Sequence, residues 1–205
     1  MKLSVSFLGK ENYNEILELI DKENIDYIHA DIMDGKYVPK TTIRETSLHS
    51  LNHKYDTHLM VKEPSSYIEG FSKLNTEFIT IHLDIDEDVD MLIDKIKGYG
   101  LKVGIAINPN QPIDLVYKYL DRIDLVLIMT VVPGLPGQEM IMECTNKIIP
   151  LKNKIKELNR DILIETDGGI NNNTIDYVID SDIVVCGSFI TNVNIHERVE
   201  FIKNK

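Results

Sequence analysis

Short apolar runs rich in β-branched residues alternate along this chain with segments whose apolar residues recur at helical spacing. The eight runs are Leu3–Phe7, Tyr27–Ile32, Thr57–Val61, Phe78–Leu83, Val103–Ile107, Leu125–Val131, Ile162–Thr166 and Ile183–Cys186. Helical spacing is clearest at Tyr13–Ile20, Met91–Ile96 and Ile148–Leu158. Strands that alternate with helices form a parallel sheet that the helices cover. The alternation therefore predicts an α/β fold.

Chain length decides between the two common forms of this fold. Eight strand–helix units in 205 residues leave about 25 residues for each unit, which is short but sufficient for a (β/α)8 barrel. An open doubly wound sheet has fewer strands and usually a Gly-x-Gly-x-x-Gly turn after the first strand. The segment after the first run, residues 7–12, holds one glycine. No linker rich in Pro, Gly or Ser divides the chain, so we predict a single (β/α)8 TIM barrel domain over residues 1–205.

The charge balance excludes several classes of partner. The chain has 22 Lys and Arg against 33 Asp and Glu, a formal net charge of −11. Such a surface repels nucleic-acid phosphates and anionic lipid, so we expect neither nucleic acid nor a membrane as a partner. Cys144 and Cys186 are too few for a disulfide framework. The N-terminus turns polar too early for a signal peptide, and the longest apolar runs reach about half of a membrane span. We expect a cytoplasmic protein, and self-association into a homo-oligomer is left open.

Polar side chains occupy strand ends where a packed barrel would hold apolar ones. His29 and Asp31 alternate on one face of the second predicted strand, His58 belongs to the third, and Asp167 follows the seventh. Because TIM barrels carry their chemistry at this end of the strands, we expect the four side chains to converge. Two buried carboxylates repel each other unless a cation compensates them. His and Asp ligands suit zinc, iron, manganese or cobalt. The alternative is a salt-bridged His/Asp network without metal.

Glycine-containing loops follow the last three predicted strands. They are Gly134–Gly137, Gly168–Gly169 and Gly187–Ser188. The loops after strands seven and eight of such barrels often bind phosphate through backbone N–H groups beside a helix N-terminus. All four arginines lie away from these loops, so backbone amides would have to hold the anion. Three methionines, Met33, Met60 and Met129, fall near the same strand ends, where they either fill the core or line the site.

The remaining histidines are less informative. His82 ends the fourth predicted strand and is either a hydrogen-bonded core residue or part of the site. His49, His53 and His196 fall in helical or connecting segments, and we expect them on the surface.

A set of motifs occurs in fixed order over nearly the whole chain. They are Ser6–Leu8, His29–Gly35, Tyr37–Pro39, His58–Val61, Asn108–Pro109, Met129–Gly134, Asp167–Ile170 and Gly187–Ser188. The most specific are His-x-Asp-x-Met-Asp-Gly and Met-Thr-Val-x-Pro-Gly. In order and spacing, the set resembles the ribulose-phosphate 3-epimerase family.

The resemblance implies a metal-dependent isomerase of pentose phosphate metabolism that interconverts D-ribulose 5-phosphate and D-xylulose 5-phosphate. Such an enzyme moves the C3 proton through a cis-enediolate. The family's metal ligands match His29, Asp31, His58 and Asp167, and its acid/base pair matches Asp31 and Asp167. The positions that match its substrate-binding residues are Ser6, Met33, His58, Met60, Met129, Gly134, Leu135, Pro136, Gly137, Gly168, Gly169, Gly187 and Ser188.

Three departures from the family pattern concern the substrate. Tyr37–Lys40 reads Tyr-Val-Pro-Lys where the family usually has Phe-Val-Pro-Asn, and Asp180–Asp182 replaces the usual Ala-Gly-Ala. Pro136 has no N–H to offer a phosphate. The alternatives are therefore a 3-epimerase of a six-carbon ketose phosphate such as allulose 6-phosphate, or a barrel that binds sugar phosphate without catalysis. A non-catalytic barrel would be expected to lack Asp31 or Asp167, and both are present.

Overall fold

Eight parallel strands close into a barrel in the computed structural model, which describes residues 1–205. The strands are β1 (Lys2–Ser6), β2 (Tyr27–Met33), β3 (Lys54–Met60), β4 (Thr76–His82), β5 (Lys102–Ile107), β6 (Leu125–Met129), β7 (Leu163–Asp167) and β8 (Ile183–Cys186). They pair in chain order, and β8 returns to pair with β1, so the sheet has no free edge. The predicted barrel is confirmed.

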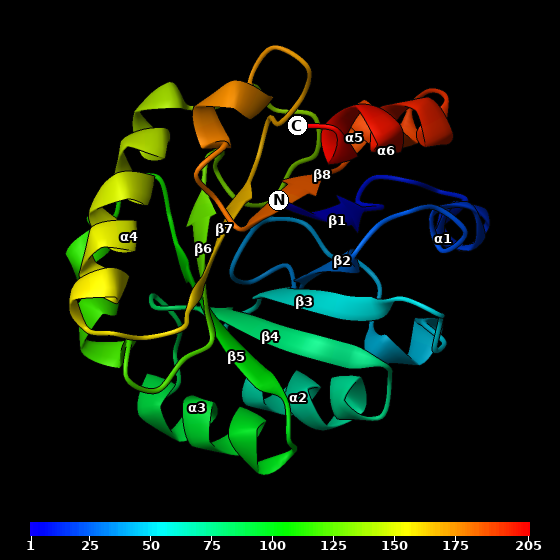
Figure 1. Cartoon of the computed structure of the whole chain (residues 1–205). Coiled ribbons are helices and arrows are strands. Elements are labelled where there is room, and N and C mark those ends of the chain that lie inside the picture. The colour runs from blue at the N-terminus through cyan, green and yellow to red at the C-terminus, as the bar shows by residue number, and fades with distance from the viewer.

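Helices surround the barrel on its outside (Figure 1). They are α1 (Tyr13–Ile20), α2 (Ser65–Ser72), α3 (Val89–Gly98), α4 (Ile148–Glu157), α5 (Ser188–Thr191) and α6 (Ile195–Lys203). The apolar spacing therefore located α1, α3 and α4 correctly. The expectation of a helix after every strand was wrong at three connections, which hold only 3₁₀ turns: η1 (Glu45–Ser47), η2 (Ile113–Tyr119) and η4 (Ile175–Val178). A further 3₁₀ segment, η3 (Met142–Lys147), leads into α4. The 3₁₀ connections are short, and η2 is rich in β-branched and aromatic residues that form α-helix poorly.

Alternate residues of a strand enter two separate cores, as β6 shows. Val126 and Ile128 belong to a cluster of 45 buried residues between the barrel and its helices. Leu125, Leu127 and Met129 belong to a cluster of 8 buried residues inside the barrel. Burial of these apolar surfaces is the main force that stabilises the barrel.

β2 breaks this apolar rule on its inner face. Ile28, Ala30 and Ile32 join the outer core, as expected for a strand covered by helices. The intervening positions hold His29 and Asp31, which are buried polar residues. The inside of the barrel is therefore polar at the level where β2 approaches its C-terminal end.

Aspartates join neighbouring strands at the opposite, N-terminal end of the barrel. The backbone N–H of Asp26 donates to the Leu3 carbonyl (2.9 Å), while its carboxylate accepts from the Leu3 N–H (2.8 Å). The same two bonds join Asp124 to Val103 (2.8 and 2.9 Å) and Asp182 to Ile164 (2.8 and 2.8 Å). We call this arrangement the aspartate clasp. It satisfies the N–H group of the second residue of β1, β5 and β7 with a carboxylate acceptor.

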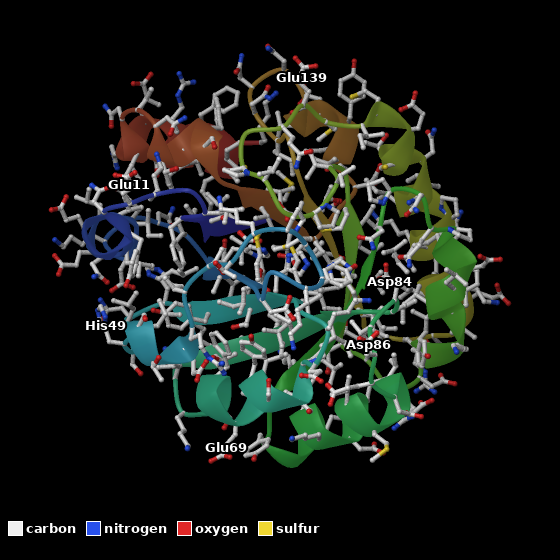
Figure 2. The ribbon with its side chains drawn as sticks, turned by 180° about the vertical axis from the view of Figure 1, so that it is seen from behind. Glu11, His49, Glu69, Asp84, Asp86 and Glu139 are labelled. Atoms are coloured by element: carbon white, nitrogen blue, oxygen red, sulfur yellow. The ribbon has the colours of Figure 1, made fainter.

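Acidic side chains occur on several parts of the surface. In Figure 2 the side chains of Glu11, Glu69, Asp84, Asp86 and Glu139 are distributed around the molecule. None of the helices is both long enough and apolar enough to cross a bilayer.

Candidate active site

Strand register brings the predicted site residues together. In the β2–β3 ladder, Asp31 pairs with His58 and Met33 pairs with Met60. In the β6–β7 ladder, Met129 pairs with Asp167. Since side chains of paired residues lie on the same face of a sheet, these residues share the inside of the barrel at its C-terminal end.

The four predicted metal ligands form one compact cluster. One nitrogen or carboxylate oxygen from each of His29, Asp31, His58 and Asp167 lies within 4.8 Å of the others. Asp31 Oδ1 is 3.5 Å from His29 Nε2 and 3.4 Å from His58 Nδ1. Its second oxygen, Oδ2, accepts a hydrogen bond from Ser6 Oγ at 2.7 Å. The side chains that spacing predicted to converge therefore do converge.

The donor atoms of this cluster fit a divalent cation. His29 Nε2 and His58 Nδ1 are buried, face the Asp31 carboxylate and have no hydrogen-bond partner. His29 Nδ1 is 2.7 Å from Asp56 Oδ2, which holds its proton and leaves the Nε2 lone pair facing the cluster. Unpaired buried nitrogens are rare in folded proteins because each costs free energy. A metal coordinated by two imidazoles and two carboxylates would satisfy them.

The two carboxyls of the cluster have different electrostatic surroundings. Burial alone would raise the pKa of Asp31, but the facing rings of His29 and His58 hold it well below its ordinary value. Burial raises the pKa of Asp167 to about 6, where His29 opposes the rise and the charge of Asp31 adds to it. The pKa of Asp31 is therefore lowered and that of Asp167 raised, so of the two carboxyls Asp167 holds a proton more readily.

A cavity of about 330 Å³ opens beside this cluster. Asp31 and Asp167 lie in its wall, and so do most of the predicted substrate-binding residues: Ser6, Met60, Met129, Gly134, Leu135, Pro136, Gly137, Gly168, Gly169, Gly187 and Ser188. His58 and Met33 do not line it. His58 is fully buried behind Asp31, and Met33 packs with Val38 and Met60. Their contact with substrate stays a prediction.

The loop after β6 crosses the mouth of the barrel toward the loop after β1. A Cβ added at Gly9 would lie 2.8 Å from Pro136 Cγ, so the proline ring is seated directly on that glycine. Gly169, in the loop after β7, has φ +66°, and a Cβ there would lie 2.4 Å from N of Met140, which belongs to the segment after β6. Only glycine fits this close approach of two backbones. The cavity is therefore roofed by one loop and walled by another.

A sequence profile of the ribulose-phosphate 3 epimerase family matches residues 2–191. The chain belongs to this family. The ribulose-phosphate 3-epimerase of Buchnera aphidicola subsp. Baizongia pistaciae is 39% identical over 201 residues, which cover 93% of this chain and 86% of the relative. The protein of that name from Bacillus subtilis is 36% identical over 184 residues, covering 86% and 84%. The one from Treponema pallidum is 36% identical over 178 residues, covering 84% and 82%.

Solved structures share the fold of this epimerase-family chain at much lower identity. KGPDC from Streptococcus mutans superposes with a TM-score of 0.69 at 12% identity, over 99% of this chain and 95% of that chain. The 3-hexulose-6-phosphate synthase from Salmonella typhimurium gives 0.61 at 17% identity, over 100% and 97%. These likenesses concern the barrel alone.

Two acidic residues beneath the cluster of this epimerase-family barrel were not predicted. Asp56 is fully buried and accepts from His29 Nδ1 (2.7 Å) and Ser4 Oγ (2.9 Å). Glu165 is also fully buried, and burial, with Asp56 beside it, raises the pKa of its carboxyl well above the ordinary value. Spacing could have found both, since Asp56 precedes His58 by two residues and Glu165 precedes Asp167 by two, which places each pair on one strand face.

Of the other histidines, one is buried beside the cluster and three lie at or near the surface. His82 is completely buried and contacts His58, and burial lowers the pKa of its ring well below the ordinary value. His49 and His196 are exposed, and His53 is half-buried against Asp21. Figure 2 shows His49 at the outer edge of the molecule, away from the barrel mouth.

Proposed function

We propose that this chain inverts C3 of D-ribulose 5-phosphate to give D-xylulose 5-phosphate, and the reverse. Its family and the shared name of its relatives support this reaction. The observation that carries it is the pair of carboxyls, Asp31 and Asp167, in one buried cluster that borders a cavity. Inversion requires one group to remove the C3 proton from one face of the sugar and another group to protonate the opposite face. Two carboxyls on different strands can flank a carbon in this way.

Both proposed acid/base residues are held by fixed contacts. Ser6 Oγ donates to Asp31 Oδ2 at 2.7 Å, which leaves Oδ1 as the oxygen that faces the histidines. The backbone carbonyl of Asp167 accepts from Thr130 N (2.8 Å) and Thr130 Oγ1 (2.9 Å). In one direction one carboxylate takes the C3 proton and the other carboxyl delivers a proton, and in the reverse direction the roles exchange. Fixed positions keep the proton donors and the substrate carbon aligned.

The metal in this proposal is a single divalent cation bound by His29, Asp31, His58 and Asp167. When bound, it supplies a Lewis acid beside the oxygens that become negative in the cis-enediolate. The ligand set of two imidazoles and two carboxylates suits zinc, iron, manganese or cobalt. Asp56 holds His29 in the tautomer that a ligand needs, since its carboxylate accepts the Nδ1 proton.

The phosphate of the substrate is assigned to the far side of the cavity. Gly168, Gly169, Gly187 and Ser188 line it there, and no arginine does. In a chain of net charge −11, backbone N–H dipoles are the donors that these loops can offer an anion. The loop Gly134–Gly137 would close over the bound sugar, with Pro136 contributing no N–H. Residues 1–205 act in this proposal as one catalytic domain with a small ketose phosphate as substrate.

Metal analysis combined with an activity assay tests the proposal. The purified chain is expected to bind one equivalent of divalent metal and to epimerise D-ribulose 5-phosphate. In deuterated water, solvent deuterium should enter C3 during turnover. If the chain turns over allulose 6-phosphate faster than D-ribulose 5-phosphate, its substrate is instead a six-carbon ketose phosphate. Binding of ketose phosphate without deuterium exchange would contradict catalysis.

A further inference from the structure

His82 is a buried histidine that the proposed reaction does not use. It ends β4, its side chain is fully buried, and its ring meets that of His58 edge to edge, with centroids 5.0 Å apart and ring planes at 30°. Its Nε2 lies 2.8 Å from His58 Nε2. Two imidazole nitrogens approach this closely only when one proton lies between them, so one ring donates and the other accepts.

The other side of the His58 ring decides which ring donates. Nδ1 of His58 faces Asp31 Oδ1 at 3.4 Å and has no hydrogen-bond partner. If Nδ1 coordinates the metal, its lone pair must be free, and the single proton of the neutral ring then resides on Nε2. His58 Nε2–H therefore donates, and His82 Nε2 accepts. The proton of the neutral His82 ring then resides on Nδ1, which has no hydrogen-bond partner, so the assignment rests on the metal-facing Nδ1 of His58.

We propose that His82 is a positioning residue that fixes His58 in the Nε2–H tautomer and so presents its Nδ1 to the metal. This inference rests on the proposed metal site. It makes the two metal-binding imidazoles complementary: His29 is oriented by the carboxylate of Asp56, and His58 by the neutral ring of His82. A neutral acceptor has a physical advantage here, because Asp31, Asp56, Glu165 and Asp167 already place four carboxyl groups inside the barrel.

The ring of Tyr37 also contacts His82. The two ring centroids are 4.8 Å apart at 38°. The Tyr37 hydroxyl donates to Asp84 Oδ1 (2.8 Å) and accepts from Asn108 Nδ2 (2.9 Å). These bonds tie the loop after β2 to the ends of β4 and β5. His82 therefore contacts both His58 and a tyrosine that two hydrogen bonds hold in position.

Two substitutions separate the acceptor from the ring. H82Q retains an acceptor at about the position of Nε2 but loses the aromatic ring, whereas H82F retains a ring and loses the acceptor. Zn(II) affinity is measured by competition with a chromophoric chelator. We expect H82F to weaken Zn(II) binding by about 10- to 100-fold, the usual cost of losing such an outer contact. H82Q should stay close to the unaltered chain. H196Q and H196F, at an exposed histidine, serve as matched controls.

A direct readout of the proton comes from the unaltered chain, so the test does not depend on the variants folding. In the Zn(II)-loaded protein labelled with 15N-histidine, long-range proton–nitrogen spectra should show His58 protonated at Nε2 and His82 protonated at Nδ1 only. A proton on His82 Nε2 overturns the inference, and so does weaker binding by H82Q than by H82F. In both cases the proposed metal site and reaction would stand. Failure of the unaltered chain to bind Zn(II) or any other divalent metal would instead overturn both.

Discussion

The aspartates at the two ends of the barrel differ in how completely they and their neighbours are hydrogen-bonded. At the N-terminal end, the clasp residues Asp26, Asp124 and Asp182 each accept a hydrogen bond from a strand N–H and donate another to the same residue. At the mouth, Asp31 and Asp167 lie in one cluster with buried nitrogens that have no partner. Satisfied charges stabilise a fold, whereas gathered and incompletely paired charges are typical of functional sites. The comparison divides the barrel into a stabilising end and a reactive end.

Removing a carboxylate from the reactive end should have the largest effect on turnover. Asp31→Asn and Asp167→Asn are each expected to lower kcat by at least about a hundredfold, because each face of the sugar has one proposed proton carrier. Steady-state assays with D-ribulose 5-phosphate measure this. Asp176→Asn, which changes an aspartate bonded to Lys205 on the surface, is the control and should leave kcat unchanged. Near-normal turnover in either site variant would contradict the scheme of two carboxyls.

A side chain at Gly187 should weaken substrate binding. A Cβ there would lie 3.6 Å or more from the nearest atoms, which are those of Ser6, so it would point into open space. The branched side chain of Gly187→Val would then occupy the cavity that the phosphate needs. We expect KM to rise by about tenfold or more, the scale of steric exclusion from a fitted pocket. Gly98→Val, at a helix position with open space around it, is the control. An unchanged KM with an intact fold would place the phosphate elsewhere.

Removing a carboxylate of the aspartate clasp should lower stability but leave activity unchanged. Asp124→Ala leaves the buried N–H of Val103 without its acceptor, which should lower the free energy of unfolding by about 1–3 kcal/mol. Urea denaturation measures this change, and kcat/KM should stay at the level of the unaltered chain. Asp121→Ala removes a surface contact with Arg160 and should cost much less. If Asp124→Ala lost activity at a temperature where the protein is folded, this would contradict the assignment of the N-terminal end to stability alone.

The smallest effect concerns stability in acid. Although burial opposes it, hydrogen bonds from the backbones of His53 and Asn52 and from the His53 ring lower the pKa of Asp21. A carboxyl with a lowered folded-state pKa stabilises the protein above its unfolded pKa of about 4, and this contribution is lost as the pH falls through the folded value. Denaturation midpoints measured from pH 6 to pH 3 should therefore fall less steeply for Asp21→Asn. Parallel profiles would show that these bonds contribute nothing to acid stability.

Sequence patterns were sufficient to predict features that depend on a single strand. β-Branched runs located the strands, and a spacing of two placed His29 and Asp31 on one face, since side chains of a strand alternate. Contacts between strands were harder to predict. The contact of His82 with His58 depends on the stagger between β3 and β4, where the register shifts between Tyr55 and Asp56. No spacing within a single strand encodes that shift.

The expectation of a helix after every strand was wrong at residues 113–119, which form a 3₁₀ turn in which Val116 and Tyr119 are buried. The β-branched and aromatic residues of this segment form α-helix poorly. The role of Met33 stays a prediction. Its position after Asp31 predicted a place at the site, and it packs with Val38 and with Met60, which lines the cavity.

Asp182 has a consequence for the order in which the barrel is completed. Its clasp binds β7, while its backbone carbonyl accepts from Lys2 N at 2.8 Å, so the residue lies at the seam where β8 meets β1. Every other strand pair joins segments that are neighbours along the chain. During synthesis on the ribosome, β1 therefore lacks one of its two partners until nearly the whole chain has emerged. Until then its backbone presents an open edge, the kind of surface that invites pairing with other nascent chains.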